Sequence, residues 1–176
     1  AEELADYVSA IAELYHKNPF HNFEHASHVT MSVTKLLSRI VNPRETEILG
    51  GGGGEEAAHE KTAADLHDNT FGITSDPLTH FACVFSAMIH DVDHPGVPNS
   101  TLVGEHTTMA KFYQNQSVAE QNSVDVAWNL LTSDRYSKLL ECLCPNQEEF
   151  VRFRQLVVNM VCATDVMDKE LGAQRK

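Results

Sequence analysis

Residues 77–94 read PLTHFACVFSAMIHDVDH. The part before His90 is apolar on nearly every side when it is drawn as a helix, which is typical of a helix buried in the centre of a domain. The Pro95-Gly96 pair that follows stops such a helix. We therefore expect a stiff central helix whose last turn carries His90 and Asp91.

Further segments with a helical spacing of apolar residues lie on both sides of this helix. They cover residues 1–16, 21–41, 100–115, 118–132, 135–142 and 148–171. No alternating apolar and polar segment bounded by hairpin turns occurs, and we see no internal repeat. The sequence therefore predicts an all-α domain, built as an irregular multi-helix array.

Residues 42–76 differ in composition from the rest of the chain. Gly50 to Gly54 is an unbroken glycine run, and the polar stretch after it has little apolar periodicity. Because ordering such a run costs much backbone entropy, we expect a mobile, Gly-rich loop inserted in a single domain over residues 1–176. A phosphate-binding glycine loop is the alternative, but no strand precedes the run and no Lys-Ser or Lys-Thr pair follows at the spacing of that motif.

The charge of the chain limits the class of partner. With 13 basic and 25 acidic residues the net charge is −12, the wrong sign for binding a nucleic-acid polymer. A small anionic substrate remains possible, because a metal ion supplies its own positive charge. No apolar run of roughly 18 residues occurs, so we expect no membrane contact within this chain.

Four cysteines lie mostly inside apolar stretches, a pattern that indicates reduced thiols in the core. This favours a cytoplasmic location, although a longer parent protein could be tethered to a membrane through other regions.

Two short segments combine imidazoles and carboxylates: His21-Asn22-Phe23-Glu24-His25 and His90-Asp91-Val92-Asp93-His94. These side chains are ligands for Zn²⁺, Mn²⁺ or Mg²⁺, and a bound divalent ion can activate water for hydrolysis. The alternatives are a pair of histidines that only packs helices, and aspartates that only cap a turn. Polar groups placed beside an apolar core are costly unless they bind something, so the two segments together predict a metal site.

Three motifs resemble those of the class I 3′,5′-cyclic-nucleotide phosphodiesterases. Residues 20–26 resemble their Y-H-N-x-x-H-A signature, residues 90–99 their H-D-x-x-H-x-G-x-x-N signature, and residues 162–165 their A-T-D segment. The resemblance implies a helical fold of the HD-domain and cyclic-nucleotide phosphodiesterase type. It also implies hydrolysis of cyclic AMP, cyclic GMP or both to the nucleoside 5′-monophosphate.

The resemblance further implies roles for individual residues. His25, His90 and Asp91 would be metal ligands, with Asp91 shared between one ion, expected to be Zn²⁺, and a second, expected to be Mg²⁺ or Mn²⁺. His21 would be the general acid. Other residues fall at positions that line the pocket or orient these groups: His94, Asn99, Glu120 and Thr164.

The chain also departs from the family pattern. His28 stands where the family has an aspartate, and Asn122 and Ser123 stand where it has two histidines. In the family a fourth aspartate ligand and the residues that read the base lie further downstream, and Asp165 is not at that ligand position. We therefore expect residues 1–176 to be the N-terminal part of a longer catalytic domain, inactive alone, within a parent protein that has further domains.

Two other classes of function stay open. One is a hydrolase of the broader HD superfamily that acts on another nucleotide or phosphate ester. The other is a catalytically degenerate regulatory module, which the substitutions at His28, Asn122 and Ser123 would favour.

Overall fold

The computed structural model describes residues 2–39, 73 and 75–166, and within these ranges the regular structure is helical throughout. The prediction of an all-α fold is confirmed. The elements, in chain order, are α1 (Glu2–Glu13), α2 (Phe23–Leu37), α5 (Pro77–Ile89), α6 (Asn99–Gly104), α7 (Thr108–Phe112), α8 (Val118–Leu131), the 3₁₀ helix η1 (Asp134–Tyr136), α9 (Ser137–Leu143) and α10 (Gln147–Cys162).

The Gly-rich loop predicted over residues 42–76 lies outside the described residues, except for 73, 75 and 76. None of the helices in the described part combines the length and the apolar character needed to cross a membrane.

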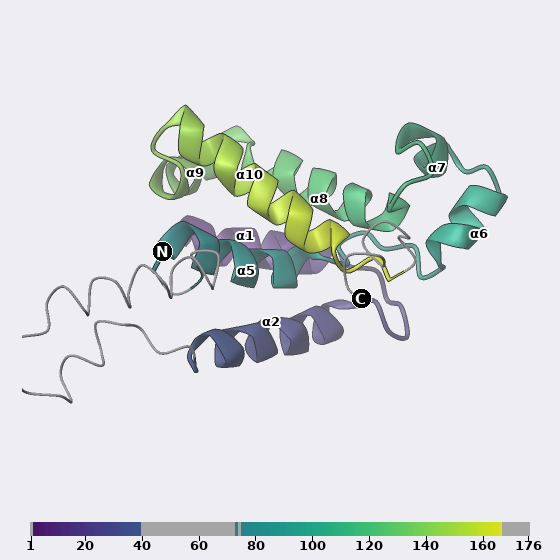
Figure 1. Cartoon of the computed structure of the whole chain (residues 1–176), viewed down its shortest axis with the longest axis horizontal. Coiled ribbons are helices and arrows are strands. Elements are labelled where there is room, and N and C mark those ends of the chain that lie inside the picture. The colour runs from purple at the N-terminus through teal and green to yellow at the C-terminus, as the bar shows by residue number, and fades with distance from the viewer. Residues whose placement is uncertain (1, 40–72, 74, 167–176) are drawn as a thin grey trace, which may run out of the picture.

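Helix α5 lies between α2 and α10, in the centre of the molecule (Figure 1). Asp76 caps its first turn, because the Asp76 carboxylate accepts hydrogen bonds from the backbone N–H groups of Leu78 and Thr79, both at 3.2 Å. Buried residues along α5 include Ala82 and Ile89. The prediction of a central helix from its apolar pattern is therefore confirmed.

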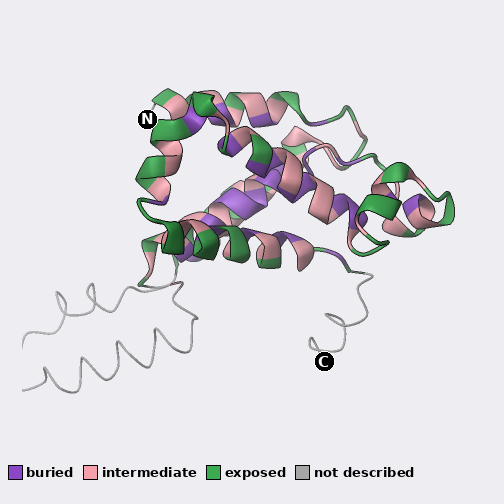
Figure 2. Cartoon of the chain, turned by 90° about the horizontal axis from the view of Figure 1, so that it is seen from above, coloured by how far each residue is buried: buried purple, intermediate pink, exposed green. Residues whose placement is uncertain are grey.

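An aromatic cluster joins α5 to the helices around it. Tyr7 of α1 stacks on Phe85 of α5 with ring centroids 5.9 Å apart, and Phe85 contacts Phe153 of α10 at 5.4 Å. Trp128 of α8 lies 5.6 Å from Phe153. The Tyr7 hydroxyl is satisfied by donating to the carbonyl of Ala127 at 2.9 Å. Figure 2 shows the buried residues on the sides of the helices that face one another, as expected for one shared core.

A second long-range contact fixes the end of α5. Tyr15 follows α1, and its hydroxyl donates to the carbonyl of Met88 at 2.7 Å. This bond attaches the segment after α1 to the turn of α5 that precedes His90. The helix end that carries the expected ligands is thus held from two sides, by packing and by a hydrogen bond.

The prediction of one helix over residues 100–115 is wrong, because the segment forms two short helices, α6 and α7. The chain turns at His106, which has a positive φ of 52°. The N–H of Thr107 donates back to the carbonyl of Leu102 at 3.2 Å, a bond that closes a helix end. The Thr107 hydroxyl then accepts from the N–H of Ala110 at 3.1 Å and caps α7.

The prediction that the last helix continues to about residue 171 is also wrong, since α10 ends at Cys162. Turns follow it, and the Thr164 hydroxyl donates to the carbonyl of Val161 at 2.7 Å. The backbone therefore leaves the helix axis just where Thr164 and Asp165 occur. Helices α1 and α2 also end a few residues earlier than their apolar patterns predict.

Asp76 should make stability depend on acid pH. Hydrogen bonds from Thr79 and Arg152 lower the pKa of Asp76, although partial burial opposes them. A carboxylate with a lowered pKa stabilises the fold above its ordinary value of about 3.9 and loses this contribution as the pH falls through the lowered folded value. Asp76→Asn keeps a capping side chain but removes the charge, so we expect it to cost about 1–2 kcal/mol near neutral pH.

Thermal unfolding between pH 6 and pH 3 measures this effect. The midpoint of the original chain should fall more steeply below about pH 4 than that of Asp76→Asn. Asp134→Asn, at an exposed position of η1, is the matched control and should follow the original chain. Parallel curves for all three proteins would contradict the assignment to Asp76.

Candidate metal centre

The start of α2 positions the first two histidines. Asn22 is the N-cap, and its side-chain oxygen accepts a hydrogen bond from the N–H of His25 at 2.9 Å. His25 therefore lies in the first turn, and His21 lies just before the cap. The Phe20 ring packs against both imidazoles, at 5.1 Å from His21 and 4.3 Å from His25.

The end of α5 positions the next two residues. His90 is the C-cap, and its Nδ1 lies 2.9 Å from the carbonyl of Ala87. Since only a protonated Nδ1 can donate to a carbonyl, Nε2 is the nitrogen of His90 left to bind a metal ion, and it lies 3.1 Å from Asp91 Oδ2. The Nε2 of His25 lies 3.7 Å from the same oxygen.

These three residues fit a divalent cation. Asp91 Oδ2 is buried and has no hydrogen-bond partner, while imidazole nitrogens of His25 and His90 lie beside it. A buried carboxylate oxygen without a donor is costly, and a cation would satisfy it. His25, His90 and Asp91 also bring their ligand atoms within 4.8 Å of one another. Two imidazoles and a carboxylate are typical ligands of Zn²⁺ and similar ions.

A second group shares Asp91 with the first. The ligand atoms of His21, Asp91 and His94 likewise lie within 4.8 Å of one another. The rings of His21 and His94 stack with centroids 3.8 Å apart and an interplanar angle of 13°. His94 Nδ1 accepts a hydrogen bond from the N–H of Gly96 at 3.0 Å, which fixes the orientation of its ring.

Burial and neighbouring charges set the protonation of these groups. Burial lowers the pKa of His25 and of His94, so both rings favour the neutral form that binds metals. Burial opposes the charge of Asp91, but the positive field of His90 and of the other nearby histidines outweighs it and lowers the pKa of Asp91. Burial also opposes a charge on His90, but the Asp91 carboxylate beside the ring outweighs burial and raises the pKa of His90.

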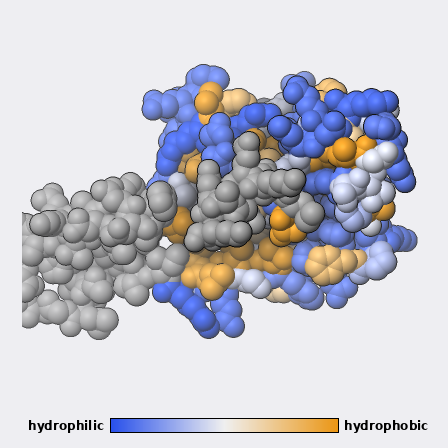
Figure 3. Space-filling model, turned by 45° about the vertical axis from the view of Figure 1, so that its right-hand side comes forward, coloured by the Kyte–Doolittle hydropathy of each residue, from blue (hydrophilic) through white to orange (hydrophobic). Residues whose placement is uncertain are grey.

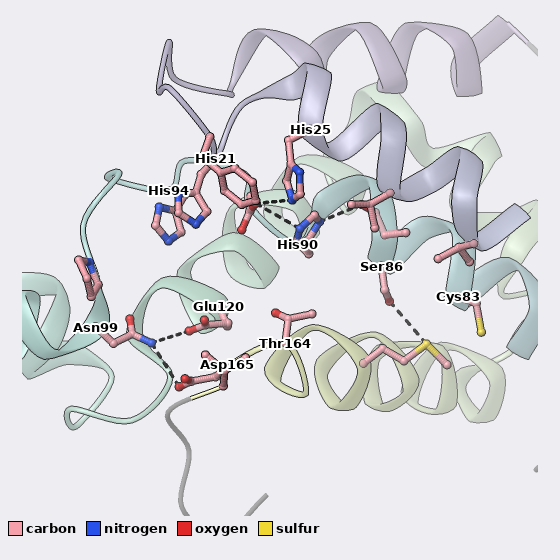
Figure 4. A pocket seen from close by; sticks show the side chains of 18 of the residues that line it. His21, His25, Cys83, Ser86, His90, His94, Asn99, Glu120, Thr164 and Asp165 are labelled. Atoms are coloured by element: carbon pink, nitrogen blue, oxygen red, sulfur yellow. Dashed lines mark hydrogen bonds and ion pairs between the residues drawn. The ribbon is translucent and has the colours of Figure 1, made fainter. Parts of the chain in front are cut away.

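An acidic and amide network lies across the pocket from the histidines (Figure 4). The Asn99 Nδ2 donates to Glu120 Oε2 at 2.8 Å and to Asp165 Oδ2 at 3.2 Å, and Ser117 donates its hydroxyl to Asp165 at 2.9 Å. Thr164 lines the same pocket. Burial raises the pKa of Glu120, and the Asp165 carboxylate adds to the shift.

All eight residues singled out from the sequence thus line one pocket, and the structure adds others that the sequence did not assign. Asp165 enters the network through its bonds to Asn99 and Ser117, and its place in the A-T-D segment was the available signal. Asn18, whose side chain bonds to the carbonyls of His21 and His94, had no such signal. Ser117 takes a left-handed backbone with φ 34°, which gives no pattern in the sequence.

The three departures from the family pattern have different surroundings. His28 is exposed on α2. The Asn122 side chain donates to Asp93 at 3.0 Å, and the buried Ser123 hydroxyl donates to the carbonyl of Val92 at 2.7 Å. Asn122 and Ser123 therefore support the turn that follows α5.

The cavity has a volume of about 870 Å³ and two chemically different ends. The polar end holds the histidines and carboxylates described above. The other end is apolar, and α2 contributes to it with Val29, Val33 and Leu36. Figure 3 shows one face of the molecule on which apolar side chains form a band between hydrophilic ones. The cavity could thus hold a ligand with an anionic group near the histidines.

Comparison with known proteins agrees with these features. The family model of the 3′5′-cyclic nucleotide phosphodiesterases matches residues 20–170. The probable 3′,5′-cyclic-AMP phosphodiesterase pde-4 of Caenorhabditis elegans is 29% identical over 163 residues, which cover 93% of this chain and 19% of the relative. The dual specificity calcium/calmodulin-dependent 3′,5′-cyclic nucleotide phosphodiesterase 1C of Mus musculus is 30% identical over 165 residues, covering 93% of this chain and 19% of the relative.

The crystal structure of the phosphodiesterase domain of the Salpingoeca rosetta rhodopsin phosphodiesterase shares the fold. It superposes with a TM-score of 0.73 at 22% identity and covers 98% of this chain and 43% of that chain. The chain thus spans about a fifth of the length of the curated relatives it matches. Because the family model matches most of its length, the chain belongs to the 3′,5′-cyclic nucleotide phosphodiesterase family.

Proposed function

We propose that this chain supplies the metal ligands and the general acid for hydrolysis of a 3′,5′-cyclic nucleotide to the nucleoside 5′-monophosphate, as part of a longer catalytic domain. The observation that carries the proposal is the buried Asp91 Oδ2, which has no hydrogen-bond donor and lies between His25 and His90. The names of the relatives include enzymes for cyclic AMP, for both nucleotides and for cyclic GMP. We therefore propose the class of substrate without choosing between the two nucleotides.

His25, His90 and Asp91 would hold one ion, proposed to be Zn²⁺. Asp91 would share its carboxylate with a second ion, proposed to be Mg²⁺ or Mn²⁺. When bound, such ions neutralise the phosphodiester and activate water for its hydrolysis. The lowered pKa of Asp91 keeps the shared carboxylate ionised for this purpose.

His21 would donate the proton that the departing O3′ needs. Its ring is held on one face by the stacked His94 and at its edge by Phe20, so its orientation is restricted. A ring within ligand distance of Asp91 lies close to where the phosphate would bind. Proton donation from a ring N–H of His21 to O3′ would complete bond cleavage.

Asn99 and Glu120 would orient groups at the far side of the pocket. The Asn99 side chain is itself fixed, because its Oδ1 accepts from the N–H of Ala119 at 2.9 Å while its Nδ2 donates to Glu120. Thr164 and His94 complete the lining near these groups. A rigid set of this kind orients a substrate and excludes loosely held water.

The proposal also covers the location of the protein and the length of its parent protein. A cytoplasmic location agrees with the four cysteines, which are thiols and not disulfides. A longer parent protein agrees with the small share of each curated relative that this chain covers.

The direct test is hydrolysis of cyclic AMP and cyclic GMP by the longest gene product that contains these residues. We expect the 5′-monophosphate as product and a loss of activity with a chelator that divalent ions reverse. Hydrolysis of other phosphate esters alone would favour the broader HD superfamily. Absence of both bound metal and hydrolysis would favour a degenerate regulatory module.

Removal of a ligand side chain should strongly weaken metal binding. We expect His25→Ala or His90→Ala to weaken zinc binding by at least about 100-fold, because loss of an outer partner alone commonly costs about 10- to 100-fold. The measurement is competition with a zinc indicator. His80→Ala is the matched control, since His80 is exposed on the same helix as His90, and it should bind zinc as the original chain does. An equal loss in the His80 variant would argue against the assigned site.

The role of His21 can be tested through the leaving group. A general acid matters for the alkoxide O3′ and hardly matters for 4-nitrophenolate, which leaves without a proton. In the longest gene product, His21→Ala should lower kcat for the cyclic nucleotide by about 10²- to 10⁴-fold. For a nucleoside 5′-(4-nitrophenyl phosphate), the loss should stay below about tenfold. Equal losses for both substrates would show that His21 does not act as the acid.

A further inference from the structure

The two segments that carry the proposed metal ligands meet at one side chain, that of Asn18. Its Nδ2 donates to the carbonyl of His94 at 2.7 Å and to the carbonyl of His21 at 3.1 Å. Asn18 lies in the loop before α2, and His94 lies in the turn after α5. A single amide group thus holds together two loops that are more than seventy residues apart in the chain.

The bonds of Asn18 continue into the first turn of α2. The carbonyl of Asn18 accepts from Asn22 Nδ2 at 2.8 Å, and Asn22 Oδ1 accepts from the N–H of His25 at 2.9 Å. A connected path of hydrogen bonds therefore runs from His94 through Asn18 and Asn22 to His25. Asn18 contacts no ring nitrogen and no carboxylate of the metal site in this path, so it would act only through the backbone that carries them.

Gly96 is matched to Asn18. Gly96 has a positive φ of 78°, and a Cβ atom at this position would lie 2.8 Å from Asn18 Oδ1. Real Cβ atoms do not approach an oxygen so closely, so a side chain at position 96 would displace Asn18. The N–H of Gly96 also donates to His94 Nδ1 at 3.0 Å, which links the backbone at Gly96 to the stacked ring.

We infer that Asn18 is a positioning residue of the metal centre, whose side-chain amide sets the place of the His21 and His25 segment against the turn with Asp91 and His94. This inference rests on the proposed function in so far as the positioned groups bind metal. An amide suits the task because the position needs two donors directed at two carbonyls. Asp has the same shape and no donor, and Ala has neither.

Asn18→Ala and Asn18→Asp test the inference in the chain of residues 1–176, with Zn²⁺ alone and Co²⁺ alone as probes. We expect zinc affinity to fall by about 10- to 100-fold in both variants, as for other partners that orient ligands. The d–d absorption of bound Co²⁺, which reports the arrangement of its ligands, should change in band position or intensity. Asn18→Asp should be affected at least as much as Asn18→Ala, because a carboxylate would face two carbonyl oxygens.

Asn146→Ala is the matched control for folding. Asn146 caps α10 by accepting from the N–H of Glu149 at 2.9 Å, so its loss should also lower thermal stability. It lies outside the pocket lining, and the zinc affinity and the Co²⁺ spectrum should stay as in the original chain. A purely structural role of Asn18 would make the Asn18 and Asn146 variants alike in both metal measurements, and this result would overturn the inference.

A double-mutant cycle with Gly96→Ala tests the contact itself. In the original chain the new methyl group meets Asn18 Oδ1, whereas in Asn18→Ala that oxygen is gone. Gly96→Ala should therefore lower zinc affinity less in the Asn18→Ala background than in the original chain, which is a non-additive result. Additive effects would mean that the strain of the positive φ at position 96 accounts for the whole loss, and they would overturn the match between Gly96 and Asn18.

A measurement without metal separates this inference from the proposed function. The ring protons of His21 and His94 should be shifted upfield in NMR spectra by their stacking, and the shift should decrease in Asn18→Ala but not in Asn146→Ala. If the original chain binds neither ion, the metal centre and the inferred positioning of it both fail. If it binds them and the Asn18 variants keep the affinity, the Co²⁺ spectrum and the ring shifts, only the inference about Asn18 fails.

Discussion

The packing of α2 and α10 on opposite sides of α5 determines where His25, His90 and Asp91 lie. Helix α5 is apolar enough to be buried by both neighbours, so its last turn points into the interior with little freedom to move. His90 and Asp91 occur at that turn, and α2 brings His25 beside them. On the other side, α10 ends where Thr164 enters the pocket. Hydrophobic burial therefore supplies the rigidity that a metal site needs.

This arrangement buries the Asp91 carboxylate, which costs free energy. Its Oδ2 is buried without a hydrogen-bond donor, and a buried polar atom without a partner is destabilising. The positive field of the neighbouring histidines keeps the carboxylate ionised, as its lowered pKa indicates, and a divalent ion would bind to the oxygen that still has no donor. The unsatisfied Asp91 oxygen is thus unfavourable in the chain alone and favourable once an ion binds it. Metal binding would therefore stabilise the fold.

The sequence predicted the central helix because burial on all sides leaves a local pattern, and it pointed to the candidate site residues because they fall in short motifs. Periodicity over residues 77–89 reflects burial on all sides, whereas the site residues were assigned from motifs that resemble those of the family, with His21 before the N-cap of α2 and His25 in its first turn. It did not predict the break between α6 and α7, because His106 adopts a positive φ that its residue type does not signal. It also gave no indication of the bond from Asn18 to His94, since hydrogen bonds between distant loops leave no periodic trace.

The substitutions relative to the family pattern also bear on the choice between an enzyme and a degenerate module. Asn122 and Ser123 replace imidazoles, yet both form hydrogen bonds that hold the turn after α5, to Asp93 and to the carbonyl of Val92. His16 adds a further bond to Asp93 at 2.8 Å. A buried carboxylate oxygen without a donor, as at Asp91, is costly unless a cation binds it. The buried Asp91 oxygen, in a turn that other side chains support, therefore favours the proposed metal centre over a degenerate module.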